Sequence, residues 1–152
     1  MATTALPQVI NGILSTLTNA SPLAGVRIFD GPEVDMSYPN DFIVVGHDGS
    51  EDGEVSVASV SQVFEQLGNM KQFEDGSVDC FLSTWDGGTS LSARRARAGV
   101  LISAIDSAIR ANSTLDGSCL FSSLSSHSMT YLQTDVGAAV NINFTITYKA
   151  RT

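Results

Sequence analysis

The sequence predicts an α+β domain, in which a mostly antiparallel β-sheet is packed against two α-helices. The clearest observation is the strict alternation of apolar and polar side chains over residues 137–149, which is the pattern of a strand with one buried face. Two other segments repeat apolar residues every three or four positions, as amphipathic helices do. Strands grouped in hairpins beside two such helices are typical of the α+β class, and we expect a single domain over residues 1–152. The apolar positions of the alternating strand are Ala138, Val140, Ile142, Phe144, Ile146 and Tyr148.

The first helix is predicted over residues 6–17, with Pro7 tolerated in its first turn and Pro22 marking the stop. A short strand follows over residues 26–29. Residues 41–46 form a continuous apolar run, so we expect a strand that is buried on both faces and lies centrally in the sheet.

Two further runs, residues 55–66 and 78–85, have the composition of strands and are expected to pair as a long antiparallel hairpin. The polar residues Glu74 and Asp75 followed by Gly76 predict a turn before the second run. This hairpin would lead directly into the second helix.

Thr89 or Ser90 is predicted to cap the second helix, which should end near Asn112. Its apolar stripe should face the core, whereas the opposite face is small and mostly uncharged. That face is either packed by another element or a neighbouring subunit, or it is a plain Ala/Ser surface. The stripe consists of Ala98, Leu101, Ile102, Ile105 and Ile109, and the opposite face of Ala96, Val100, Ser103, Ala104, Ser107 and Ala111.

The last part of the chain is expected to form a closing hairpin. The serine-rich run over residues 122–126 is predicted to be irregular, and residues 129–134 to form a strand. Residues 135–137 predict the turn into the final strand.

The acidic net charge of the chain argues against general nucleic-acid binding. Sixteen acidic and eight basic residues give a net charge of −8, and such a chain repels phosphate backbones. Charged residues make up 16% of the chain against a usual share of roughly 25%, so much of the surface must be neutral. No apolar run approaches the roughly 20 residues that span a membrane, and no membrane association is expected.

No residue pattern predicts a catalytic, cofactor or metal site, and we expect the protein not to be an enzyme. His47 and His127 are isolated from other potential metal ligands. Cys119 and His127 are the only nearby Cys/His pair and carry no family signature, which favours a core thiol and a surface histidine. The loop over residues 86–90 has the position of an anion site but lacks the lysine of a P-loop.

The distribution of charge predicts a subunit or partner interface. Arg94, Arg95 and Arg97 crowd the start of the second helix, where the helix dipole disfavours cations. Residues 30–54 contain half of the acidic residues and no Lys or Arg. An acidic surface on the next copy would satisfy the arginines, and such head-to-tail contacts close into rings. The open alternative is pairing within one chain, or solvation. The acidic side of the predicted interface comprises Asp48, Glu51, Asp52 and Glu54.

The order of these elements resembles the tail terminator proteins of long-tailed bacteriophages. The resemblance rests on the opening helix over residues 6–17, the long hairpin before the Arg-rich segment 90–112, and the closing strand over 137–147. It implies a ring-forming subunit, typically hexameric, that binds the last ring of tail-tube protein and halts tube polymerisation. The ring would then present a joining surface to head-closure or neck proteins.

The same resemblance implies a virion protein of the tail or neck that assembles in the host bacterial cytoplasm. DNA would pass through the lumen without specific binding, because like-charged walls prevent sticking. Two other classes remain open. One is a neighbouring head-closure, neck-adaptor or tail-completion protein, and the other is a small hydrolase or ligand-binding domain.

Overall fold

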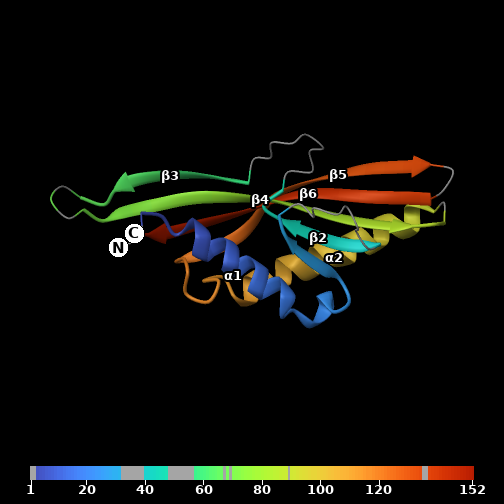
Figure 1. The fold of residues 1–152 in the computed structure, drawn as a ribbon, viewed down its shortest axis with the longest axis horizontal. Coiled ribbons are helices and arrows are strands. Elements are labelled where there is room, and N and C mark those ends of the chain that lie inside the picture. Colours follow the sequence, from blue (N-terminus) through green and yellow to red (C-terminus); the bar gives the residue numbers. More distant parts are fainter. Residues whose placement is uncertain are drawn as a thin grey trace.

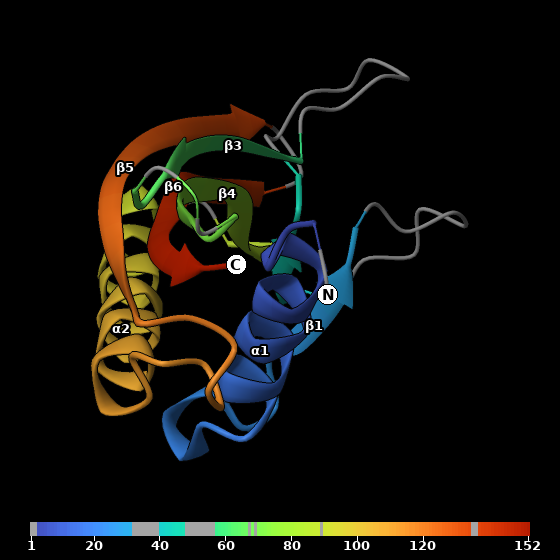
Figure 2. The same ribbon diagram turned by 90° about the vertical axis from the view of Figure 1, so that its left-hand side faces the viewer.

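A six-stranded mixed sheet with two helices on one of its faces forms the fold, and this confirms the predicted α+β class. A computed structural model describes residues 3–31, 40–47, 57–66, 68, 70–88, 90–134 and 137–152. The helices α1 (Leu6–Thr18) and α2 (Leu91–Ala111) lie on the same side of the strands, as Figures 1 and 2 show. Neither helix in these ranges is both long and apolar enough to cross a membrane.

Two long central strands, β4 and β6, organise the sheet. The strand order is β1-β2-β4-β6-β5, and β3 pairs with the first half of β4. Only β1 and β2 run parallel, whereas every other pair is antiparallel. The strands are β1 (Arg27–Asp30), β2 (Asp41–Val45), β3 (Ala58–Phe64), β4 (Gln72–Asp86), β5 (Phe121–Thr134) and β6 (Gly137–Arg151).

The alternating C-terminal segment is strand β6, as predicted. Every second residue from Ala138 to Tyr148, which together are the apolar positions of the alternation, is buried. Strands β4 and β5 flank β6 on its two sides. Its backbone donors and acceptors therefore find partners along most of its length.

The main core lies between this face of the sheet and the two helices. Helical side chains meet Ile43, Leu82 and Ile142 of three neighbouring strands. Burying one such aliphatic side chain contributes about 1.5–3 kcal/mol, so this layer is the chief source of stability. The fully buried helical residues are Val9, Ile13 and Leu17 of α1 and Ala98, Leu101, Ile105 and Ile109 of α2.

Strand β2 is buried on both faces, which confirms the prediction from its apolar run. Ile43 and Val45 join the main core, whereas Phe42 and Val44 join Phe29 in a second cluster on the opposite face. The Phe29 and Phe42 rings meet edge to face with 6.2 Å between their centroids. The strand is an interior one, placed between β1 and β4.

The turn predicted at Glu74, Asp75 and Gly76 is wrong, because all three residues lie inside β4. The β3–β4 hairpin reverses between Phe64 and Gln72 instead. Glycine is needed within the strand because the ring of Tyr148 lies across it. A Cβ atom at Gly76 would be 2.4 Å from a carbon of that ring.

The irregular segment predicted over residues 122–126 is also wrong, since β5 runs through it with one register shift between Leu124 and Ser126. Its small hydroxyl side chains bond to neighbouring groups rather than to their own backbone. Ser122 Oγ donates to Ser113 O at 2.9 Å, and Ser125 Oγ donates to Thr145 O at 3.2 Å. Pairing with β6 thus overrides a composition that is typical of loops.

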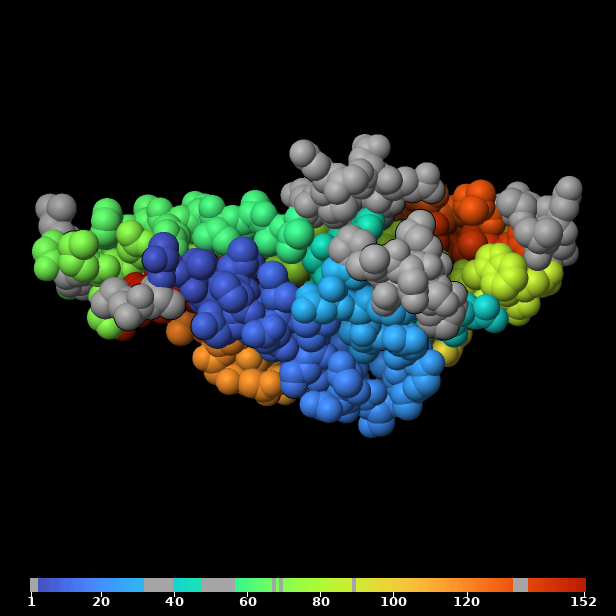
Figure 3. Space-filling view, viewed as in Figure 1, coloured from blue at the N-terminus to red at the C-terminus, as the bar shows by residue number. Residues whose placement is uncertain are grey.

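The two antiparallel hairpins extend toward opposite ends of an elongated molecule. The β3–β4 hairpin reaches one end and the β5–β6 hairpin the other (Figure 1). In the space-filling view the residues of β3 form a ridge along the upper side of the end that the β3–β4 hairpin reaches (Figure 3). The strands thus set the length of the molecule. Helix α1 lies beneath its middle, and α2 runs from there toward the end reached by the β5–β6 hairpin (Figure 1).

Candidate functional site

The three arginines lie at the start of α2, where the structure begins the helix as predicted. Ser90 Oγ accepts a hydrogen bond from Ala93 N at 3.2 Å, which caps the helix. No acidic residue lies in the first turn. Compensation for the arginines must therefore come from other elements.

Two of the arginines pair with carboxylates of the same chain. Arg94 Nη1 donates to Thr84 Oγ1 at 2.9 Å, and its Nη2 lies 3.4 Å from Asp86 Oδ2. Arg97 Nε donates to Asp41 Oδ2 at 3.1 Å, while Thr84 donates to the other oxygen of Asp41 at 2.7 Å. This network joins α2 to the ends of β2 and β4. Pairing within one chain, the open alternative, is therefore what Arg94 and Arg97 do here.

The third arginine, Arg95, is exposed and lies against an aromatic side chain of β5. Its Nη1 donates to the Tyr131 hydroxyl at 3.3 Å, and its guanidinium carbon is 6.0 Å from the ring centroid. Exposed Arg and Tyr side chains are enriched in protein interfaces. The interface role of this arginine stays a prediction.

The acidic half of the predicted interface lies outside the described residues. It comprises Asp48, Glu51, Asp52 and Glu54. A contact between these carboxylates and the arginines of another copy accordingly stays a prediction as well.

The thiols and imidazoles do not assemble into a reactive centre in the described part of the chain. Burial raises the pKa of the Cys80 thiol to about 12 and also raises that of Cys119. Both thiols are therefore protonated near neutral pH, and a protonated thiol is a poor nucleophile. His127 is exposed, and no group of three or more potential metal ligands occurs among the described residues.

The loop before α2 is closed by its own hydrogen bonds. Asp86 Oδ1 accepts from Gly88 N at 2.9 Å, and Gly88 O accepts from Ala138 N at the start of β6. The Asp86 carboxylate beside the start of α2 adds negative charge there, which disfavours an anionic ligand. The loop serves to join β4, α2 and β6.

The sheet face opposite the helices is a broad polar surface made by β3, β4, β6 and β5. Its side chains bond across the strands. Ser83 Oγ donates to Asn141 Oδ1 at 2.8 Å, and Thr145 Oγ1 donates to Asp79 Oδ1 at 3.2 Å. Such cross-strand pairs satisfy the polar groups of this face. Further residues of the face include Ser59, Ser61, Asp75, Ser77, Ser123, Asn143, Thr147 and Lys149.

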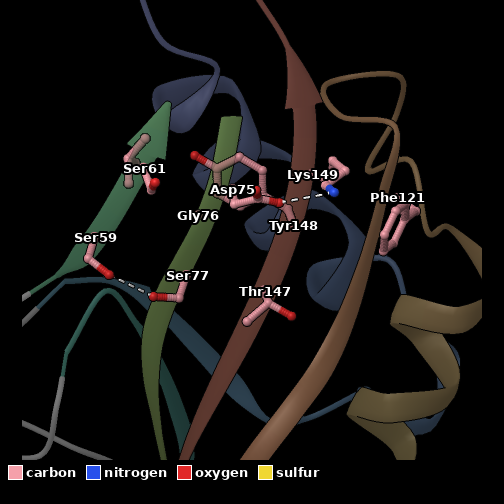
Figure 4. Close-up of a pocket in the computed structure, with 10 residues that line it drawn as sticks. Ser59, Ser61, Asp75, Gly76, Ser77, Phe121, Thr147, Tyr148 and Lys149 are labelled. Atoms are coloured by element: carbon pink, nitrogen blue, oxygen red, sulfur yellow. Dashed lines mark hydrogen bonds and ion pairs between the residues drawn. The ribbon is translucent and has the colours of Figure 1, made fainter. Parts of the chain in front are cut away.

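A hollow of about 630 Å³ lies on this polar face, over the half of the sheet where β3 is paired (Figure 4). One row across the four strands runs from Ser61 through Asp75 and Lys149 to Phe121. Lys149 Nζ lies 3.5 Å from Asp75 Oδ1, so the charges within the row offset each other. The hollow is lined by hydroxyl groups, one ion pair and one phenyl ring, which are groups that can contact the surface of another protein.

No family model matches the chain, and a search of curated proteins finds no significant match.

The buried carboxylate of Glu74 was not predicted from the sequence. Glu74 is fully buried in β4, where Oε2 accepts from the Tyr148 hydroxyl at 2.7 Å and from Ala5 N at 3.1 Å. Its Oε1 accepts from Gln62 Nε2 at 2.8 Å. Burial alone would raise the pKa of Glu74, but hydrogen bonds from Thr4 and these three groups outweigh it and lower the pKa. The apolar–polar alternation of β4 was the available signal, because it places Glu74 on the core side.

Proposed function

We propose that the protein is a structural subunit of a long-tailed bacteriophage that forms a ring, typically hexameric, and caps the tail tube as a tail terminator. One observation carries this proposal. Of the twelve large apolar side chains left exposed in the described part of the chain, seven lie on the edge strands β3 and β5. An exposed apolar edge is a site of association in native proteins.

The second support is the polar face of the sheet. In a ring, this face would line the lumen, and the helices would lie outside it. Its Ser, Thr and Asn side chains are uncharged, and the opposite charges of Asp75 and Lys149 offset each other. Together with the net charge of −8, such a wall lets DNA pass without specific binding.

The proposal gives the protein no catalytic role. The Cys119 thiol is buried and hydrogen-bonded to Ser113 O, whereas His127 is exposed, so this pair is not arranged as nucleophile and base. The partners proposed are further copies of the chain, the tail-tube protein, and head-closure or neck proteins, all within the virion.

The proposal is tested by binding to tail-tube protein and by tube length. Purified protein added to polymerising tube protein should bind tube ends and leave shorter tubes, as seen by negative-stain electron microscopy. Capture of portal-side proteins, with no binding to tubes, would assign the protein to the neck as an adaptor or closure protein. A monomer that binds neither would contradict both assignments and favour a small hydrolase or ligand-binding domain.

A further inference from the structure

We propose that β3 of one copy pairs antiparallel with β5 of the next, so that strands β3, β4, β6 and β5 of successive copies form one continuous sheet. This inference rests on the proposed ring and identifies the contact that would build it. Its partner is therefore a second copy of this chain.

Strand direction favours this contact. The pairs β3–β4, β4–β6 and β6–β5 are all antiparallel, so β3 and β5 run in opposite directions at the two edges of the four strands. When two copies stand side by side in the same orientation, β5 of one and β3 of the next are antiparallel. A rotation about a ring axis therefore preserves the alternation.

Both edges lack the charges that usually protect an edge strand. Neither the seven residues of β3 nor the fourteen of β5 include Asp, Glu, Lys or Arg. The third edge strand, β1, has four residues and carries Arg27 and Asp30 at its two ends. Short length and charge are the common means of blocking edge pairing. Thus β1 has the features that block pairing with another strand, whereas β3 and β5 lack charged residues.

The exposed apolar side chains are concentrated at the same two edges. Twelve large hydrophobic residues of the described chain are exposed, and seven of them lie on β3 and β5. Edge pairing would pair the backbone groups at these edges and cover part of the apolar surface of these side chains against the neighbouring strand. The seven are Val60, Val63 and Phe64 on β3, and Phe121, Met129, Tyr131 and Leu132 on β5.

A second copy suits both edges better than an unrelated protein does. Each chain supplies one edge of each direction, so a closed set of copies leaves neither edge unpaired. A different protein would cover one edge and leave the other exposed. The copies also repel each other through their net charge of −8, and contact at two uncharged edges keeps that repulsion smallest.

Cysteine pairing tests this contact directly. Ser61→Cys on β3 is combined, one at a time, with a cysteine at Ser123, Ser126, Ser128, Thr130 or Leu132, which share the polar face of the sheet. Within one copy β3 and β5 are three strand spacings apart, about 14 Å, whereas a disulfide needs Cα atoms within about 7 Å. Any disulfide between the two positions must therefore join two copies.

We expect at least one combination to give a ladder of covalent multimers under mild oxidation, ending at the size of the ring. The parent chain, with Cys80 and Cys119 buried, and each single-cysteine variant should give no ladder. A matched control joins Ser61→Cys to Val100→Cys, because Val100 is exposed on α2. Rings in native mass spectrometry with no ladder from any combination would overturn the edge contact and leave the proposed ring standing. A monomer at all concentrations would overturn both.

Discussion

At the scale of single residues, Glu74 ties the start of the chain to the two central strands. Its carboxylate accepts from Ala5 N, Gln62 and Tyr148, three groups that belong to the N-terminal segment, β3 and β6. A buried carboxylate without such donors would cost several kcal/mol. The cluster therefore sets the position of the β3–β4 hairpin relative to the body of the molecule.

Replacing this carboxylate should destabilise the fold. Glu74→Gln puts an amide N–H₂ where an acceptor is needed, and we expect a loss of about 2 kcal/mol in the free energy of unfolding, measured with urea. Asp75→Asn, on the exposed side of the same strand, is the matched control and should change it by less than about 0.5 kcal/mol. Equal losses in the two variants would contradict the role of the cluster.

The same residue predicts a dependence of stability on pH. The pKa of Glu74 is lower in the folded protein than its ordinary value of 4.5. Its contribution is therefore complete above that value and is lost as the pH falls toward the folded pKa. The difference in stability between wild type and Glu74→Gln should shrink below pH 4.5. A difference that grows on acidification would show the opposite sign of shift.

The arginine network yields a prediction about two kinds of ion pair. Asp41→Asn removes the carboxylate partner of Arg97, which is only partly exposed, and should cost roughly 1–2 kcal/mol of unfolding free energy. Asp106→Asn removes the partner of Arg110, whose side chain is 80% exposed, and should cost less than about 0.5 kcal/mol. The same urea titration of both variants checks the ranking, and a reversed ranking would contradict it.

At the scale of elements, the packing of the Tyr148 ring of β6 over β4 depends on one glycine. Gly76→Ala would bring a Cβ atom against the Tyr148 ring, and we expect a loss of about 1–3 kcal/mol in thermal or urea unfolding. In a Tyr148→Ala background the cost of the same change should fall, because the ring is gone. Gly99→Ala is the matched control, since a Cβ there meets nothing within 4 Å and should stabilise α2. An unchanged cost in the Tyr148→Ala background would place the clash elsewhere.

The elements that were predictable are those whose pattern comes from one buried face. The alternation in β6 and the apolar run in β2 both reflect burial, and the structure confirms them. The α2 stripe is confirmed at four of its five positions. Ile102 is only partly buried, and Ala104, which was predicted on the opposite face, is buried in the core. The misread segments were 74–76 and 122–126, whose residues are typical of turns and loops. In these segments the structure is determined by pairing with strands that are distant in sequence, and this pairing cannot be predicted from local composition.

The candidate site was predictable only in part, for a related reason. The three arginines stand out because their own helix disfavours them. The sequence does not reveal that Asp41 and Asp86 lie beside Arg97 and Arg94, because these contacts join separate elements. Likewise, the uncharged edges become meaningful only once the order of the strands is known.

At the scale of the whole molecule, salt separates two ways in which copies could meet. Contacts between arginines and the acidic segment would weaken as salt screens them. Contacts between uncharged edges of acidic copies should strengthen, because salt screens the repulsion instead. We expect the fraction of rings to rise as salt is increased from about 20 mM to about 0.5 M, measured by analytical ultracentrifugation. A falling fraction would favour the charged contact.

Self-assembly is the central claim, and native mass spectrometry of the purified protein tests it most directly. The account predicts a closed oligomer of defined copy number, typically a hexamer, in equilibrium with few other species. A single peak at 16.0 kDa over the whole accessible concentration range would contradict it.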